Sequence, residues 1–515
     1  MAGIKVPRAM STQHPDNIST PFFSDSDVLA GEGEVKEAYY VFAQLGISEQ
    51  MWDSEGKEAD NQVVEKLLSR YTEFFSKRML GKEFFLTYRV PNPSVEKEQG
   101  KILLETLHSI PRAFDVARVV NGDVPPIFEV ILPMCTSAQE IGMVRSYYEQ
   151  IVIGQKNTML GLGNREVGTG NPKPENSNRK PDTGNRKLVK DWVGDFQPES
   201  INVIPLFEDR ESILSSDVIL KQYLDDLEGR MPEYQRVFLA RSDPALNYGS
   251  VSTVLLAKMA LQKLHALEDK MSVDILPIFG VGSAPFRGNF RPDNVSNCGE
   301  EYPSVQTFTV QSSFKYDYPF RDVANAIDIL NHGRRRPPRP IDEKAALRLI
   351  DKMTKEYQKQ IASVADMINS VAALVPARRA RKLHVGLFGY ARSMKGIKLP
   401  RAIKFCAALH TFGLPPELLG LSALNEKEFD ELHTVYIKLD EDLADSARYL
   451  NKSNLEYFPK EVADGISKVI GWIDYEEDED YCAVTTKAML HYRKKENAGL
   501  EDEIKRAAWM RKFLG

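Results

Sequence analysis

The chain has 515 residues, of which 42% are hydrophobic and 27% are charged, the balance of a globular protein with a buried core. Its net charge of -6 argues against a protein that coats nucleic acid, and its four widely spaced cysteines exclude a disulfide framework or a zinc site built from cysteines. No run of about 18 apolar residues occurs, so the sequence predicts a cytoplasmic protein that does not span a membrane.

The first distinctive segment is MSTQHPDN, residues 10–17. It is polar and has neither helical nor strand periodicity, so we expect a loop. Such a loop either remains in solvent near the end of the chain or folds back over a site that uses the imidazole of His14. The remaining sequence decides between these alternatives.

Seven short apolar runs are predicted to be strands, because near-continuous apolar strands are typical of parallel sheets that are buried on both faces. The segments between them have the apolar spacing of helices. Repeated strand–helix units predict a parallel α/β fold, either doubly wound or closed into a barrel, although an eighth strand is not evident. The predicted strands are 84–90, 127–133, 201–207, 236–240, 273–280, 305–311 and 383–389.

Two segments depart from this pattern. Residues 163–187 are rich in Gly, Asn, Pro and Lys, and are predicted to form a mobile surface loop. From about residue 340 onwards the apolar spacing is mostly helical. We expect residues 1–515 to form a single elaborated domain.

Charged residues follow several of the predicted strands, at the carboxyl ends where parallel α/β folds bind their ligands. Two carboxylates on separate strand ends suit Mg²⁺ or Mn²⁺, which retain water or substrate oxygens as further ligands. Arginines suit a substrate that carries both carboxylate and phosphate groups. The carboxylates are Glu208 and Asp243, and the arginines are Arg89, Arg287, Arg291, Arg392 and Arg401.

The segment GVGSAPFRGN, residues 280–289, contains three glycines that allow backbone N–H groups to approach an anion, and Arg287 adds positive charge. The segment matches neither the P-loop nor the dinucleotide fingerprint, and neither motif occurs elsewhere in the chain. A nucleotide ligand is therefore not favoured.

Eight segments occur in a recognisable order between residues 10 and 420: MSTQHPDN, LTYRVPNP, IPLFED, ARSDPALNYG, GSAPFRGN, TVQSSFKYDYP, RKLHVGLFGYAR and LPRAIKF with GLPPELLG. Together they resemble the archaeal-type phosphoenolpyruvate carboxylases, the short form of that enzyme. The resemblance implies a TIM-like parallel α/β barrel with extensive additional helices, assembled as a homotetramer. It also implies that phosphoenolpyruvate and bicarbonate are converted to oxaloacetate and phosphate with Mg²⁺ or Mn²⁺.

The resemblance also implies roles for individual residues. His14 would be the catalytic histidine, and imidazole suits removal of the carboxyphosphate proton because it titrates near working pH. The other implied site residues are Arg287 and Arg401 in catalysis, Arg89, Arg392 and Gly288 in substrate binding, and Glu208 and Asp243 in metal binding.

One departure from the longer enzymes of the family concerns a cation. Those enzymes have a lysine three residues after the metal-binding aspartate, where this chain has Leu246. Lys315 or Arg291 is a candidate to supply the missing charge.

Two other functions remain alternatives. A Mg²⁺-dependent C–C lyase of the same barrel superfamily, similar to citramalyl or citryl lyases, would share the carboxylate pair but would not need His14. A nucleic-acid-binding scaffold would use residues 333–340 and 377–382 as basic patches. The acidic overall charge and the lack of interleaved aromatic residues argue against this second alternative.

Overall fold

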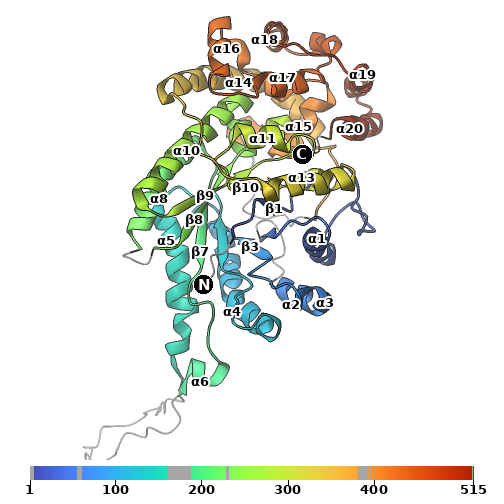
Figure 1. Ribbon diagram of the computed structural model, residues 1–515. Helices are drawn as coiled ribbons and strands as arrows, with labels where there is room; N and C mark the ends of the chain where they lie inside the picture. Colours follow the sequence, from blue (N-terminus) through green and yellow to red (C-terminus); the bar gives the residue numbers. More distant parts are fainter. Residues whose placement is uncertain are drawn as a thin grey trace, which may run out of the picture.

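The computed structural model describes residues 5–54, 61–160, 187–227, 231–380, 392–394, 397–512 and 514. Its centre is a closed barrel of parallel strands in the order β1-β10-β9-β8-β7-β4-β3-β2 (Figure 1). The predicted barrel with additional helices is therefore confirmed, and the doubly wound alternative is excluded. The strands are β1 Ala9–Ser11, β2 Glu49–Asp53, β3 Phe85–Arg89, β4 Glu129–Leu132, β7 Asn202–Phe207, β8 Tyr234–Ala240, β9 Asp274–Gly280 and β10 Thr307–Val310.

Six of these strands match the apolar runs seen in the sequence, but β1 and β2 were missed. Strand β1 has only three residues, and β2 reads EQMWD, in which three of five residues are polar although all five are buried. The count of seven strands is thus corrected to eight, and the predicted strand at 383–389 lies outside the described residues.

The barrel interior has an apolar layer and a charged layer. At the amino ends of the strands, Arg236 of β8 donates hydrogen bonds to Glu49 of β2 (2.6 and 2.8 Å) and to Glu129 of β4 (3.0 Å). This charged layer explains why β2 does not look like a buried strand. Next to it lies an apolar cluster made of Met10, Met51, Ile131, Ile204, Leu206, Phe238 and Ile278.

Helices pack around the strands and bury their apolar faces against them. Each loop that follows a strand leads into such a helix, so the carboxyl ends of the strands face a ring of loops and helix N-termini. These helices are α1 Glu32–Ala43, α2 Val63–Arg70, α3 Thr72–Phe75, α4 Gly100–Asn121, α5 Ala138–Tyr147, α7 Arg210–Leu214, α8 Ser216–Asp225, α9 Ser242–Tyr248, α10 Ser250–Met271, α11 Val295–Glu301, α12 Ser312–Tyr316 and α13 Phe320–His332.

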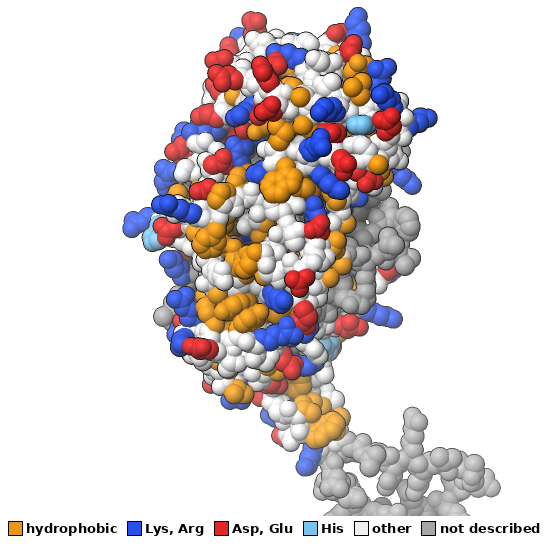
Figure 2. Space-filling view, turned by 90° about the vertical axis from the view of Figure 1, so that its right-hand side faces the viewer, with side chains coloured by type: hydrophobic (Ala, Val, Ile, Leu, Met, Phe, Trp, Pro, Cys, Tyr) orange, Lys and Arg blue, Asp and Glu red, His pale blue; other side chains and the backbone are white. Residues whose placement is uncertain are grey.

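An arm extends from α5 away from the barrel (Figures 1 and 2). It continues through helical turns to a two-stranded sheet of β5 (Met159–Leu160) and β6 (Lys187–Leu188), followed by α6 (Val189–Val193). Trp192 on α6 is 73% exposed. Residues 161–186, which include almost all of the predicted mobile loop, lie outside the described residues.

After α13 the described chain is mostly helical and covers the upper part of the barrel in Figure 1. Its longest helix, α14, starts at an Asp342 cap that accepts the N–H groups of Lys344 (2.9 Å) and Ala345 (3.1 Å). The main cluster of buried hydrophobic residues includes both barrel and helical residues. The elements are α14 Glu343–Ala372, β11 Arg392–Met394, β12 Ile397–Leu399, α15 Ala402–Thr411, α16 Glu426–His433, α17 Leu439–Ala447, α18 Lys460–Ile470, α19 Glu479–Lys494 and α20 Asn497–Arg511.

Within the described residues, no helix combines the length and the apolar character that a membrane crossing requires.

Candidate active site

The loop that follows β1 is held against the barrel rather than left in solvent. Thr12 donates its N–H to the carbonyl of Val310 (3.0 Å), and the ammonium group of Lys315 donates to the carbonyl of Thr12 (3.0 Å). Asp16 accepts the N–H of Ser313 (2.7 Å). These bonds tie both sides of His14 to β10 and α12, at the carboxyl ends of the strands.

The imidazole of His14 is half-buried and shares a 2.8 Å hydrogen bond between its Nδ1 and the Oγ1 of Thr12. Burial is the largest cause that holds the pKa of His14 well below its usual value, and neighbouring positive charge adds to the effect. The ring is therefore neutral at neutral pH. The charged groups with the strongest influence on it are, in order, Arg287, Arg89, Asp53 and Arg401.

Arg287 is 2% exposed and contacts three different segments of the chain. Its Nε donates to Ser242 Oγ (3.0 Å) at the start of α9, and its Nη2 donates to Gln311 just after β10. Its Nη1 lies 3.5 Å from the carboxylate of Asp16 and makes no hydrogen bond within the described residues. The guanidinium group is thus fixed in place while one of its nitrogens keeps its donor capacity.

Two glycines allow the loop after β9 to bring Arg287 to this position. A Cβ at Gly282 would lie 2.8 Å from Gln311 Oε1 and 3.0 Å from the guanidinium carbon of Arg287. Gly288 has φ +125°, and a Cβ there would lie 2.6 Å from Val281. The loop therefore needs glycine at 288 for steric reasons, in addition to the substrate contact expected of Gly288, and glycine at 282 leaves room for the side chains of Gln311 and Arg287.

The other predicted arginines have different surroundings. Arg89, at the end of β3, donates two hydrogen bonds to Asp53 at the end of β2 (3.0 and 2.7 Å). Arg401 is exposed and immediately precedes α15. Arg392 is the first residue of β11, paired with Leu399 of β12, and its side chain lies outside the described part of the structure.

The two predicted metal ligands lie on neighbouring strand ends. Glu208 directly follows β7, Asp243 is the second residue of α9 after β8, and β7 pairs with β8 through Phe207 and Leu239. Both carboxylates are half-buried, and Glu208 accepts the N–H of Met134 (2.8 Å). Among the described residues, no group of three or more His, Cys, Asp or Glu side chains could hold a metal. Two carboxylate donors fit a hard divalent cation that keeps water or substrate oxygens as its other ligands.

Comparison with known proteins gives a full-length match. The family model described as phosphoenolpyruvate carboxylase matches residues 6–515. The chain belongs to the phosphoenolpyruvate carboxylase family. A relative from Methanospirillum hungatei JF-1, named phosphoenolpyruvate carboxylase, is 47% identical over 99% of this chain and 100% of its own length. Relatives of the same name from Methanothermobacter thermautotrophicus and Halobacterium salinarum are 46% and 43% identical over 99% of this chain and all of their own length.

Among solved structures, a citrate lyase from Burkholderia xenovorans LB400 covers 71% of this chain and 84% of its own, with 10% identity and a TM-score of 0.34. At that score the likeness carries no argument about fold or activity. The barrel of this phosphoenolpyruvate carboxylase family member is established from its own strand pairing.

The structure brings together several residues that sequence reasoning missed. Thr12 and Asp16 lie two positions on either side of His14, inside the MSTQHPDN segment that carries the family resemblance. Ser242 likewise lies beside Asp243, inside the ARSDPALNYG segment. These motifs could have pointed to the three residues, whereas Asp53 ends a strand that the apolar pattern did not reveal.

Both candidates to replace the missing family lysine are paired with carboxylates. Leu246, at that position, is 1% exposed and packed in the core. Lys315 is fully buried and paired with Glu37 (2.9 Å). Arg291 is paired with Asp445 (2.7 Å). Both cations are therefore committed to carboxylates outside the predicted site residues.

The basic segments considered for nucleic-acid binding are also used inside the protein. Arg335 donates to the carbonyl of Ile275 (2.5 Å). Arg379 is 3% exposed and donates to both carboxylate oxygens of Glu37 (2.8 and 2.6 Å). Internal pairing of Arg335 and Arg379 reduces the charge available to a basic patch, although Arg334, Arg336 and Arg339 are exposed.

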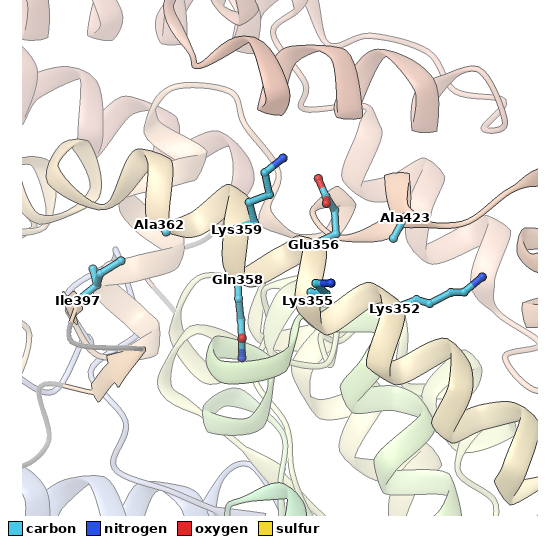
Figure 3. Close-up of a pocket in the computed structure, with 8 residues that line it drawn as sticks. All are labelled: Lys352, Lys355, Glu356, Gln358, Lys359, Ala362, Ile397 and Ala423. Carbon is cyan, nitrogen blue, oxygen red and sulfur yellow. The ribbon is translucent and has the colours of Figure 1, made fainter.

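A cavity of about 590 Å³ lies along α14 and reaches Ile397 of β12, the strand paired with β11 (Figure 3). Two of its lysines are paired with glutamates outside the cavity, Lys352 with Glu428 and Lys359 with Glu461. The cavity therefore has little net positive charge and is not the barrel mouth. Its lining residues are Lys352, Lys355, Glu356, Gln358, Lys359, Ala362, Ile397 and Ala423.

Proposed function

We propose that this chain catalyses the irreversible carboxylation of phosphoenolpyruvate by bicarbonate, with oxaloacetate and phosphate as products. The observation that carries the proposal is the contact between the His14 loop and Arg287 at the mouth of the barrel, where Asp16 lies 3.5 Å from the guanidinium group, and the charges of Arg287, Arg89 and Arg401 all act on the His14 imidazole. It occurs in a chain whose whole length matches proteins named phosphoenolpyruvate carboxylase. Phosphoenolpyruvate carries its own high-energy phosphate, so the reaction needs no nucleotide, in agreement with the absence of a P-loop motif from the sequence.

We infer that Glu208 and Asp243 hold a divalent cation, Mg²⁺ or Mn²⁺. When bound, such an ion supplies positive charge that stabilises the enolate as phosphate leaves. The half-buried positions of the two carboxylates on adjacent strand ends support this assignment.

The arginines bind and orient the phosphoryl group. Arg287 has a fixed guanidinium group with one nitrogen that keeps its donor capacity, and exposed Arg401 can approach the same phosphate from the start of α15. Arg89 and Arg392 would contact the remainder of the substrate. In this arrangement a bicarbonate oxygen attacks phosphorus, the bond to the enol oxygen breaks, and carboxyphosphate and the enolate of pyruvate result.

His14 then acts as the general base. Its neutral imidazole accepts the carboxyl proton of carboxyphosphate, which breaks down to CO₂ and phosphate, and the enolate carbon forms a new bond to CO₂. A weak base suffices because a carboxyl proton is acidic. In the tautomer that donates its Nδ1–H to Thr12 Oγ1, the hydrogen bond orients the ring and leaves Nε2 as the proton acceptor. The buried loop that carries His14 helps to keep CO₂ next to the enolate.

The test is a coupled assay in which malate dehydrogenase reduces oxaloacetate and NADH oxidation is recorded, with phosphate measured in parallel. We expect equal amounts of oxaloacetate and phosphate, and no oxaloacetate when phosphoenolpyruvate, bicarbonate or the divalent cation is omitted. The lyase alternative predicts no phosphate release from phosphoenolpyruvate. Lack of oxaloacetate in the complete mixture would refute the proposal.

We further infer a cytoplasmic homotetramer. Large hydrophobic side chains remain exposed, including Phe22 (73%), Phe320 (53%) and Trp509 (55%), and hydrophobic patches interrupt the charged surface in Figure 2. Such patches mark contact surfaces between protein chains. Light scattering coupled to gel filtration should give four times the chain mass of 58.2 kDa, and a monomer mass would contradict the inference.

A further inference from the structure

The loop of residues 282–290 carries Arg287 and closes on itself through backbone hydrogen bonds. Gly282 donates its N–H to the carbonyl of Arg287 (2.9 Å), and Phe290 donates to the carbonyl of Gly282 (2.9 Å). Phe286, which precedes Arg287, instead donates its N–H to the carboxylate of Glu417 (2.7 Å). The loop is thus anchored to a residue 131 positions further along the chain.

Glu417 belongs to a short 3₁₀ turn, Pro416–Leu418, in the helical part of the molecule. Its side chain is 3% exposed and lies 3.5 Å from Nε2 of His410 on α15. Burial raises the pKa of this carboxyl, but the charges of His410 and Arg511 and the hydrogen bond to His410 outweigh burial, so the pKa is lowered overall. The acceptor of the Phe286 N–H is therefore an ionised carboxylate, which makes the bond charge-assisted.

The ring of Phe286 is held by the same part of the molecule. It is fully buried, with its centroid 5.4 Å from that of Phe405 on α15 and 6.5 Å from that of Tyr357 on α14. Tyr357 also donates its hydroxyl to the carbonyl of Leu246 on α9 (3.0 Å), the helix that begins with Ser242 and Asp243. Phe286, the residue before Arg287, is thus held both through its backbone N–H and through its ring.

We propose that Glu417 is a positioning residue, which anchors Phe286 so that Arg287 is aimed at the phosphate of the substrate. The proposal rests on the function proposed above for Arg287. The backbone hydrogen bonds of the loop are internal to it, whereas the bond from Phe286 to Glu417 ties the loop to the helical part of the molecule. A displacement of a binding group by about 1 Å can cost about a hundredfold in rate. The helical part therefore sets the geometry of the barrel mouth.

Three variants test the proposal in the full chain. Glu417→Ala removes the acceptor and should lower kcat/KM for phosphoenolpyruvate by about ten- to a hundredfold. Glu417→Gln keeps an oxygen that can accept the Phe286 N–H and should retain most of the activity. The matched control is Glu428→Ala, which removes another buried glutamate of the helical part, one paired with Arg348 and Lys352 and not with the loop. It should leave kcat/KM unchanged.

Two measurements separate positioning from general destabilisation. In an Arg287→Ala background, Glu417→Ala should cause no further loss of kcat/KM, because the group that it positions is absent. Hydrogen exchange of the amides of residues 282–290 should accelerate in Glu417→Ala and not in Glu428→Ala. If Glu417→Ala does not fold, Phe405→Leu replaces it, with the same expectations.

Several outcomes would overturn the proposal. The first is an equal loss of kcat/KM in Glu417→Ala and Glu417→Gln. The second is a further loss of kcat/KM when Glu417→Ala is added to Arg287→Ala. The third is unchanged hydrogen exchange of the loop amides in Glu417→Ala. If Arg287→Ala itself retains full activity, the role proposed for Arg287 fails. The exchange measurement then still decides whether Glu417 anchors the loop, so the two failures are distinguishable.

Discussion

The two ends of the barrel use buried charge in opposite ways. At the amino ends of the strands, one guanidinium group, that of Arg236, is bonded to two carboxylates, those of Glu49 and Glu129. At the carboxyl ends, three of the four charged groups that most influence His14 are arginines and one is an aspartate. The base of the barrel has its cation bonded to internal anions, whereas the four groups that act most strongly on His14 carry a net positive charge.

This difference indicates which end is built for a ligand. Internal carboxylates that neutralise a buried cation contribute to the folded structure and leave no charge to bind a ligand. A net positive set of groups around a neutral base creates a local field that favours an anionic substrate. On this account, substitutions at the mouth reduce activity, and substitutions at the base reduce stability.

The largest expected effect on activity is that of His14→Asn. Loss of the general base should lower oxaloacetate formation by about 10²- to 10⁴-fold, while metal and substrate binding remain. Phosphate release that depends on the metal should persist, because attack on phosphorus does not require this residue. The ratio of oxaloacetate to phosphate measures the effect directly. Undiminished carboxylation by the variant would remove His14 from the mechanism.

At the opposite end of the barrel, Arg236→Met should destabilise the protein without altering its chemistry. Two buried carboxylates would lose their partner, so the free energy of unfolding should fall by about 3–5 kcal/mol. Urea unfolding measures the loss, and kcat/KM of the folded variant serves as the comparison. A variant with normal stability and low activity would reverse the assignment of the two ends.

A smaller effect is expected for Asp243→Asn, in which a neutral amide replaces one carboxylate of the pair. The Mg²⁺ concentration for half-maximal activity should rise by at least about tenfold. Asp209→Asn is the matched control, because Asp209 caps α7 by accepting the N–H groups of Glu211 and Ser212. Identical metal titrations for the two variants would argue against a role for Asp243.

The smallest expected effect is that of Thr12→Val, which removes the hydrogen bond to His14 while keeping the shape of the side chain. The value of kcat should fall by about two- to tenfold, and Thr12→Ser should restore it. Nitrogen chemical shifts of the imidazole report whether the ring has lost its partner. If Val and Ser variants behave alike, the hydrogen bond does not orient His14.

The strands that sequence reasoning found and missed differ in what surrounds them. Strands such as β7 are buried on both faces by apolar side chains, so their own residues identify them. Strand β2 places Glu49 inside the barrel. The buried charge of Glu49 is compensated by Arg236, which lies 187 positions further along the chain. A sequence pattern confined to β2 cannot reveal that Arg236 is the partner of Glu49.

Prediction from the sequence is limited in the same way at the candidate site. The rule that ligands bind at strand ends located Glu208, Asp243 and Arg89 from their positions alone. The contacts of Arg287 with Asp16 and Gln311 depend on where side chains point after the loop folds, and that information is spread over three segments. The anchor at Glu417 depends on packing between the barrel and the helical part, which apolar spacing does not reveal.

The most direct test of the binding site proposed at the mouth is a crystal structure with Mn²⁺ and an unreactive phosphonate analogue of phosphoenolpyruvate. We predict an anomalous manganese peak in contact with both Glu208 and Asp243, and the phosphonate oxygens on Arg287. A manganese ion bound elsewhere, or an analogue held away from the arginines that surround His14, would contradict the account.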